Sequence, residues 1–480
     1  MTGLTRRSAL LAGAGATAGL GIALGGSRTD AVAADSLASS AGGPVPATVI
    51  GPSGDTTGVT DYDNITAAIA TVPGGLSVVL LPGQWYLSQT LALATDGQVL
   101  SGSGPGTVVG IGTGPQNAGG TGFAGFSGSS LFSPAADNLR LTSMAVATGP
   151  NGTTGAPISF IDFDYTYVDY LELGHLTVSG AVGSGALVTR CNLHRSSIRN
   201  CSFTQNEGSS EIWSLGWSPA NTQNTKAGLS VTTFENITSV AACSENGVRT
   251  TPAWNIYAVG NKDLDVIRWV DCFFLNAGVE VSGGQYVYDS TQYMVDVACT
   301  GGASNVDGDR VSFTRCDFGQ AIGGAIRVGS FTSVILDHVT CGNMIVPVNG
   351  VNTGAQQDIL HVGSYPWPTL QTGGTKSGAQ PIATVGQNSA SVSIRDYCRE
   401  GDGIGSSVSD ISVSSDTVNV RIENCAVPDV GTPPRVDLNG AAGAVIENPE
   451  PKTSILNPAS DTIVIGNGAI TIGGVALTAS

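Results

Sequence analysis

Acidic and aromatic side chains gather in three segments of the chain whose composition suits the binding and cleavage of sugars. These segments span residues 205–226, 244–270 and 280–310, and the first two hold four of the six tryptophans. Cleavage of a glycosidic bond requires one protonated and one ionised carboxyl group, and an indole ring is a good platform for a sugar. The candidate catalytic residues are Glu211, Glu280, Asp263 and Asp265, and the candidate substrate-binding residues are Glu207, Trp213, Trp217, Trp254, Tyr257, Arg310 and Arg327.

The spacing of the candidate acids supports this interpretation. Asp263 and Asp265 are two residues apart, so both face one side if the segment is extended. Two neighbouring carboxyl groups can share one proton and so supply an acid. Glu211, Glu280 and Arg327 each follow a repeated motif at a similar distance, which predicts equivalent strands and one outward catalytic surface. The same charges could equally be solvated surface groups.

A metal site has weaker support in the sequence. Asp307 and Asp309 flank Gly308 and could offer oxygen ligands to calcium, with Arg310 beside them as a base. The segment has too few ligands for a standard calcium loop, so Ca²⁺ is expected only if the protein is a lyase, and no cofactor otherwise. Both aspartate pairs could also be turn residues. The four histidines are scattered without the spacing of a metal site, and His338 is expected to be structural.

The elements that must position these residues are short strands in a repeated pattern. An apolar residue, a polar residue, an Asn-like residue, a cysteine or apolar residue, a small residue and an aromatic residue recur in this order. The repeated cysteines are 71 and 44 residues apart, close to three and two turns of about 22–24 residues in a solenoid. We expect these cysteines to fill one interior stack, and the Asn-like positions to be turn residues whose side chains bond the backbone. The stack is Cys201, Cys272, Cys316 and Cys425, and the turn positions are Asn200, Asn236, Asp271 and Asn424.

Residues 54–109 open this repeat with a helical pattern, a Gly-Gly break and several short strands. Thr60 and Asp61 are expected to cap the first helical turn. The stretch resembles the opening of the pectate-lyase-like superfamily, which implies an all-β right-handed parallel β-helix with a short N-terminal capping helix, and mostly chemistry on polysaccharides. The matching residues are Gly58-Val59-Thr60-Asp61, Ala67-Ala68-Ile69, Leu81-Pro82-Gly83, Tyr86, Leu100, Gly102, Gly104 and Thr107.

Within that superfamily the branch is not fixed by motifs. The Asn-Thr-Asp, Asp-Asp, Gly-His-Gly and Arg-Ile-Lys blocks of polygalacturonases are absent from the sequence. Three classes of function follow: a glycoside hydrolase or transglycosidase acting on a neutral polysaccharide, a calcium-dependent polysaccharide lyase, and a non-catalytic surface or glycan-binding protein. Inulin fructotransferases, which pair acidic residues in a trimeric β-helix, are a variant of the first class, so a homotrimer is possible.

The N-terminal segment predicts where the protein is located, and its net charge limits its possible partners. Arg6-Arg7 and the apolar stretch after them predict a twin-arginine export signal over 1–33, followed by a flexible leader over 34–50. The β-helix is expected over 51–430 and capping strands over 431–480. A formal charge of −17 disfavours nucleic acid as a partner. No later apolar run is long enough to span a membrane, so we predict a secreted protein.

Overall fold

The structure is a computed structural model that describes part of the chain. The residues that it describes belong to the unit Pro46–Ser480. The described residues are 47–72, 77–112, 127–134, 136, 139–147, 159–163, 167–169, 172–179, 187–189, 192–204, 213–215, 228–241, 254–259, 265–276, 279–282, 285–288, 293–300, 308–319, 324–329, 331–341, 350–352, 360–363, 391–399, 409–415, 417–426, 434–449, 453–466, 469–472 and 475–477.

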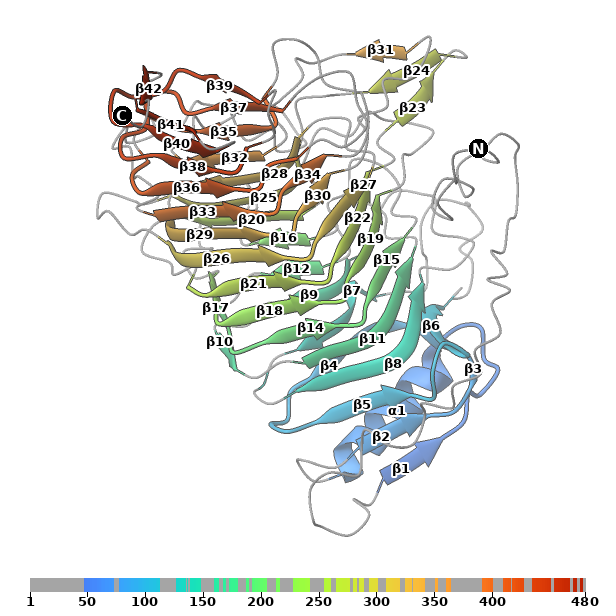
Figure 1. Ribbon diagram of the computed structural model, residues 1–480. Helices are drawn as coiled ribbons and strands as arrows, with labels where there is room; N and C mark the ends of the chain where they lie inside the picture. Colours follow the sequence, from blue (N-terminus) through green and yellow to red (C-terminus); the bar gives the residue numbers. More distant parts are fainter. Residues whose placement is uncertain are drawn as a thin grey trace, which may run out of the picture. The chain divides into compact units, whose positions relative to one another are not determined.

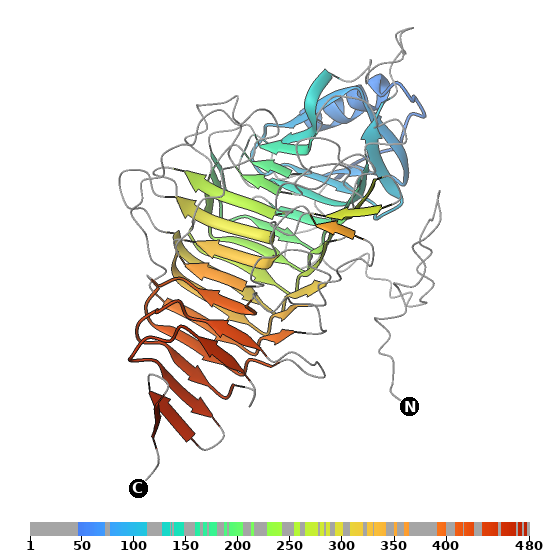
Figure 2. The same ribbon diagram turned by 90° about the horizontal axis from the view of Figure 1, so that it is seen from above.

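The chain forms the predicted right-handed parallel β-helix with one N-terminal helix, α1 (Val59–Thr71). Each rung contributes strands to stacked parallel sheets (Figures 1 and 2). One sheet has twelve strands, and we call it the twelve-stranded sheet. Its strands are β4 (Gln89–Leu93), β7 (Ser127–Pro134), β9 (Ser159–Phe163), β12 (Leu187–Thr189), β16 (Trp213–Leu215), β20 (Trp254–Val259), β25 (Tyr293–Thr300), β28 (Gly324–Gly329), β32 (Leu360–Gly363), β35 (Ile411–Val413), β37 (Arg435–Asp437) and β39 (Ser454–Leu456).

The other large sheet has 24 strands and bends within each rung, so we call it the bent sheet. It opens with β1 (Ala47–Ile50), β2 (Ser77–Leu80), β3 (Gly83–Leu87), β5 (Val99–Gly102), β6 (Thr107–Ile111), β8 (Arg140–Ala147) and β11 (Glu172–Ser179). Before the bend lie β14 (Ser197–Arg199), β18 (Thr232–Glu235), β21 (Ile267–Val270), β26 (Gly308–Thr314), β29 (Phe331–Asp337), β33 (Ser391–Arg395), β36 (Val420–Glu423), β38 (Val445–Glu447) and β40 (Ile463–Gly466). After it lie β15 (Ser202–Thr204), β19 (Thr238–Ala241), β22 (Phe273–Asn276), β27 (Asp317–Gly319), β30 (Thr340–Cys341) and β34 (Cys398–Arg399).

Two three-stranded sheets accompany the large ones. The first contains β10 (Tyr167–Asp169), β13 (Asn192–His194) and β17 (Gly228–Ser230) in parallel. In the second, β23 (Val279–Ser282) pairs antiparallel with β24 (Gln285–Tyr288), which pairs parallel with β31 (Gly350–Asn352). At the C-terminal end, β41 (Ala469–Ile472) and β42 (Val475–Leu477) add to the bent sheet in antiparallel fashion.

The core is built from side chains that repeat at the same register position on successive rungs. Phe234, Trp269 and Phe313 are register partners on β18, β21 and β26. Their rings stack, with centroids 3.9 Å apart for the first pair and 5.7 Å for the second. Alternate residues of a strand point to opposite faces, so each apolar position of the sequence repeat is buried while its neighbours face outward.

The bend of the sheet depends on one residue per rung with a left-handed backbone. Asn200, Asn236, Asp271 and Asn424 have φ between 51° and 53°, and Arg315, His338 and Asp396 fill the same position on other rungs. Asn is a favoured residue for this conformation. The sequence therefore predicted these turn positions correctly, but in place of the expected bonds to the backbone, Asn236, Asp271 and Asn424 bond to side chains of neighbouring rungs. Asn236 Nδ2, for example, donates to Asn200 Oδ1 at 2.7 Å.

The residue after each bend points inward, and this explains the repeated cysteines. Cys201, Cys272, Cys316 and Cys425 are free thiols with at most 2% of their surface exposed, which confirms the predicted interior stack. Burial raises the pKa of the Cys316 thiol well above its ordinary value. The hydrogen bond with Cys316 lowers the pKa of the neighbouring Cys272 thiol. The four buried cysteines fill their positions as small side chains.

The cap of α1 differs from the prediction. The residue before the helix is Gly58, and the amide of Thr60 donates to Asp55 Oδ2 at 3.0 Å. Asp61 is fully buried, and its two oxygens accept from the amides of Ser53 and Tyr86 at 2.8 and 2.9 Å. The prediction that Asp61 caps the helix was wrong, because its carboxylate is used to tie the helix to the first rung.

The predicted boundaries also shift at both ends. The last four residues of the predicted leader form β1, which pairs in parallel with β2. Beyond residue 430 the parallel rungs continue through β37, β38, β39 and β40 before the antiparallel strands begin. The export signal at 1–33 lies outside the described residues. Among the described residues, no helix has the length and apolar character required to cross a bilayer.

Candidate functional site

The structure places the sequence-predicted residues in several separate regions. Glu207, Glu211, Trp217, Asp263 and Asp307 lie outside the described residues, so their roles stay predictions. Trp213 and Tyr257 lie on β16 and β20 of the twelve-stranded sheet. The side chains of these two residues are not among those described.

Trp254 was expected to be a sugar platform and is instead a core residue. It is 0% exposed, and its indole Nε1 donates to Ser239 Oγ at 2.9 Å. Its ring makes edge contacts with Phe203 and Trp269 at centroid distances of 5.4 and 5.1 Å. The prediction for Trp254 was wrong because the residue falls on the inward register of β20, where no sugar can reach it.

The predicted surface of Glu211, Glu280 and Arg327 is also not formed by equivalent strands. Glu280 lies on β23, in the antiparallel hairpin with β24, whereas Arg327 lies on β28 of the twelve-stranded sheet. Asp265 is half-buried before β21, and Asp309 and Arg310 are exposed on β26 of the bent sheet. Asp309 and Arg310 therefore belong to a different sheet from Arg327.

Arg327 does lie within a polar column of its own sheet. It is half-buried between the buried residues Ile326 and Val328. Its register partner on β25 is Asp296, which is flanked by the buried residues Val295 and Val297. Its partner on β32 is His361. Partnered positions in parallel strands share a face, so these positions face away from the core, and the column continues through Asn255 on one side. On the other side it reaches Ser412, which is buried at 3% exposure.

This column was missed because its members are 31 and 34 residues apart in the chain. A local signal exists, since each charged residue is enclosed by apolar ones in Val295-Asp296-Val297, Ile326-Arg327-Val328 and Leu360-His361-Val362. The strand spacing of about 4.8 Å places neighbouring Cα atoms at that distance. The residue types at these three positions, Asp, Arg and His, are ones that acid–base chemistry uses.

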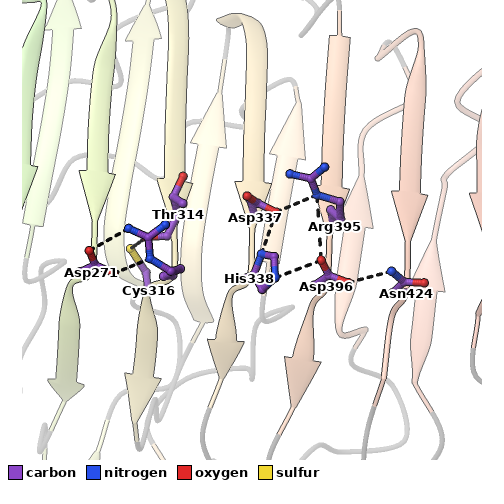
Figure 3. Close-up of polar contacts among 9 residues, drawn as sticks. Asp271, Thr314, Cys316, Asp337, His338, Arg395, Asp396 and Asn424 are labelled. Atoms are coloured by element: carbon purple, nitrogen blue, oxygen red, sulfur yellow. Dashed lines mark hydrogen bonds and ion pairs between the residues drawn. The ribbon is translucent and has the colours of Figure 1, made fainter.

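A second polar group occupies the bend, where Asp337, His338, Arg395, Asp396 and Asn424 lie together (Figure 3). His338 Nδ1 is 3.0 Å from Asp337 Oδ1, and His338 Nε2 is 3.3 Å from Asp396 Oδ2. Arg395 Nε donates to Asp337 Oδ1 at 2.8 Å. This hydrogen bond, together with that from His338, lowers the pKa of Asp337 against the opposing effect of partial burial. Sequence spacing alone had suggested only a structural role for His338.

A third set of charges is enclosed in the core and is not accessible to a substrate. Arg399 and Asp410 have side chains exposed by 2% and 0% and form an ion pair through Arg399 Nε. The Asp410 carboxylate also accepts from Tyr397 Oη at 3.1 Å and from the amide of Arg435 at 2.9 Å. Burial raises the pKa of Asp410, while the charge of Arg399 opposes that rise. The ion pair joins β34, which contains Arg399, to Asp410, the residue before β35.

Comparison with known proteins gave no match to a family model and no match among curated sequences. Several solved structures are similar. A surface adhesin of Streptococcus pneumoniae, PfbA, has 11% identity and a TM-score of 0.43, covering 90% of this chain and 99% of the adhesin. The A-module of the mannuronan C-5 epimerase AlgE4 from Azotobacter vinelandii has 11% identity and a TM-score of 0.39, covering 85% and 91%. An endo-xylogalacturonan hydrolase from Aspergillus tubingensis has 11% identity and a TM-score of 0.34, covering 91% and 99%. At these scores the likenesses carry no argument, and the fold stands on the strand register of this chain.

Proposed function

We propose that the protein is an exported carbohydrate-active enzyme that cleaves or transfers glycosidic bonds of a polysaccharide on the outer face of the twelve-stranded sheet. The observation that supports this proposal is the register of Asp296, Arg327 and His361 on three consecutive strands. This register puts an acidic, a basic and an imidazole residue at successive positions of one sheet. Asn255 extends the polar column by one strand, and its amide suits hydrogen bonds to sugar hydroxyls.

In this proposal Asp296 and His361 move protons and Arg327 holds a substrate oxygen. Two strand spacings put the Cα atoms of Asp296 and His361 about 10 Å apart with Arg327 between them, so a sugar ring lying over Arg327 would have both residues beside it. An imidazole both donates and accepts protons near neutral pH. Hydrolysis through two carboxyl groups would need a second acid beside Asp296. Glu211, two residues before β16, and Asp263 remain candidates for it, whereas Asp265 precedes β21 of the bent sheet and Glu280 lies on the hairpin of β23 and β24.

A second candidate reaction is β-elimination by a polysaccharide lyase. The central position of Arg327 favours it, because a guanidinium beside a sugar carboxylate stabilises the charge that develops when a neighbouring C–H loses its proton. Asp309 lies on β26 of the bent sheet, so calcium bound by Asp307 and Asp309 would not be held by the same sheet as Arg327. This variant of the proposal therefore uses Arg327 and His361 without that calcium site.

The test is turnover of a panel of neutral and acidic polysaccharides by the purified chain, with and without EDTA. New reducing ends without ultraviolet absorbance indicate hydrolysis, transfer gives products of changed length, and absorbance of an unsaturated product indicates elimination. Asp296→Asn and His361→Asn are expected to lower kcat about 100-fold or more, the usual contribution of a general acid or base. Arg327→Gln should lower kcat/KM, whereas Arg268→Gln, an exposed arginine on β21, is the matched control.

The third class, a non-catalytic glycan binder, predicts a different result. Binding of a polysaccharide without turnover, weakened by Arg327→Gln and unchanged by Arg268→Gln, would replace the catalytic proposal with a binding one. If all four variants are as active as the unaltered chain, the outer face of the twelve-stranded sheet is not the active site. Twin-arginine export and a homotrimer stay predictions, to be checked by detection of the protein outside the cell and by its mass in solution.

A further inference from the structure

The bend of the sheet holds two electron-rich atoms that face each other. His338 Nε2 lies 3.3 Å from Asp396 Oδ2, and His338 Nδ1 lies 3.0 Å from Asp337 Oδ1 (Figure 3). A neutral imidazole has one N–H and one lone pair. When Nδ1–H donates to Asp337, the Nε2 lone pair points at the Asp396 carboxylate. In that tautomer the two atoms repel each other unless a proton or a metal ion lies between them.

The remaining atoms of both groups are already held in place. Asn424 Nδ2 donates to Asp396 Oδ1 at 2.7 Å, which leaves Oδ2 toward the histidine. Arg395 Nε donates to Asp337 Oδ1, so the carboxylate that faces His338 Nδ1 is itself anchored. A carboxylate that accepts from one ring nitrogen fixes the tautomer and orients the other nitrogen toward a metal ion. Asp337 stands in that relation to His338.

The distances match a borderline divalent cation. Zinc bonds to histidine nitrogen and carboxylate oxygen at about 2.0–2.2 Å, so two ligands at neighbouring corners of its tetrahedron lie about 3.3–3.5 Å apart. The observed separation of His338 Nε2 and Asp396 Oδ2 is 3.3 Å. Ligand atoms of Asp337, His338 and Asp396 lie within 4.8 Å of one another. The imidazole nitrogen favours zinc over calcium or magnesium, which prefer oxygen ligands.

We propose that His338 and Asp396 bind a Zn²⁺-like divalent cation on the bend, with Asp337 as the orienting carboxylate and water in the remaining positions. More than half of the His338 side chain, 58%, is exposed, so an ion can reach it. Arg395 neutralises Asp337 and its Nε is 4.0 Å from Asp396 Oδ2. This arginine limits the affinity and makes Asp396 the main anionic ligand.

Such an ion would join two rungs that are far apart in the chain. His338 follows β29 and Asp396 follows β33. These two strands pair with each other, but residues 342–390, which include β31 and β32, separate them in the chain. A cross-link that closes a long connection gains more than one that closes a short turn. The proposed role of the ion is therefore to hold this pair of rungs together.

The experiment uses the full chain, freed of metal with EDTA and dialysed, and titrates it with ZnCl₂ near neutral pH. Bound zinc is counted by equilibrium dialysis, and the thermal unfolding midpoint is recorded with and without zinc. The variants are His338→Asn, which installs the residue found at Asn236 and Asn424, and Asp396→Asn, which keeps an oxygen for Asn424. Asp271→Asn, another carboxylate on the bend, is the control. Circular dichroism shows whether each variant folds.

The unaltered chain and Asp271→Asn are expected to bind one more zinc ion than His338→Asn and Asp396→Asn, and zinc should raise the unfolding midpoint of the first two only. Cobalt in place of zinc should give visible absorption that is lost in both site variants. Equal zinc binding by all four proteins would overturn the proposal. So would an unfolding midpoint that responds to pH through His338 but not to zinc, since a proton would then bridge the two carboxylates.

Discussion

Arg315 and Asp271 form a bidentate ion pair between neighbouring rungs at the bend. Arg315 Nε lies 2.6 Å from Asp271 Oδ1, and Arg315 Nη2 lies 2.8 Å from Oδ2. The pair occupies positions that Asn200 and Asn236 fill on earlier rungs with a single amide bond. The guanidinium lowers the pKa of Asp271 below its ordinary value, mainly through the hydrogen bond.

The double variant Asp271→Asn/Arg315→Asn tests whether this ion pair is only a substitute for an Asn–Asn bond. We expect its stability at neutral pH to be within about 1 kcal/mol of the unaltered chain, because an exposed ion pair contributes no more than that. The folded pKa of Asp271 is depressed, so its contribution is complete above the unfolded value of about 3.9 and is lost as the pH falls through the folded value. Urea unfolding at neutral and acid pH measures both effects.

The matching control is Asp437→Asn, a carboxylate away from this bend whose Oδ1 accepts from the Asn439 amide. The double variant should lose part of the acid sensitivity that the unaltered chain shows, and high salt should weaken the unaltered pair. If the double variant and the unaltered chain respond identically to acid and salt, the pair contributes nothing to the fold.

The enclosed ion pair of Arg399 and Asp410 gives a larger effect. Asp410→Asn removes one charge of a pair whose side chains are 2% and 0% exposed, and takes away the carboxylate that faces the buried Arg399 guanidinium. Breaking such a pair typically costs about 3–5 kcal/mol. The double variant Arg399→Met/Asp410→Asn removes both charges and keeps an oxygen for the Arg435 amide. Denaturant unfolding should find it more stable than Asp410→Asn alone, and the opposite order would contradict this account.

The order of residues within each rung could be predicted from the sequence, because it lies in neighbouring residues, but the predicted period was wrong. Cys201 and Cys272 are two rungs apart, and Cys272 and Cys316 are one rung apart, rather than three and two turns, because the connections between strands are longer than tight turns. The Arg315-Cys316-Asp317-Phe318 motif contains the bend, the inward thiol and the inward ring in order, and the same order recurs on other rungs. For an aromatic residue outside the repeated motif, neighbouring residues do not show whether its side chain points into the core or outward. Trp254 was assigned to the surface from the composition of its segment, whereas its register with Val295 puts it in the core.

The candidate site could not be predicted from the sequence for a related reason. Asp296, Arg327 and His361 meet only through the pairing of β25, β28 and β32, and the number of residues between these strands varies from rung to rung. Composition identifies segments rich in acids and aromatics, but the register of the sheet decides which side chains share a face. The bend cluster of Asp337, His338 and Asp396 depends on register in the same way.

Trp254 should therefore behave as a core residue when it is changed. Trp254→Ala is expected to lower the free energy of unfolding by about 3–5 kcal/mol, the usual cost of removing a buried tryptophan. Trp254→Phe keeps most of the packing against Phe203 and Trp269 but loses the bond to Ser239, so it should cost less. Denaturant unfolding ranks the three proteins. A stable Trp254→Ala protein with impaired glycan binding would restore the surface role.

Gly58, at the start of α1, tests the motif that first indicated the fold. Its φ is 83°, and a Cβ there would lie 2.6 Å from the backbone carbon of Leu87 on β3. Gly104 has a φ of 99° with nothing within 4 Å of its Cβ position, so it is the matched control for backbone strain without a clash. Gly58→Ala should lower the thermal unfolding midpoint clearly more than Gly104→Ala, because the helix must move away from the first rung. Equal shifts in the two variants would mean that the close approach of α1 to β3 does not stabilise the N-terminal end.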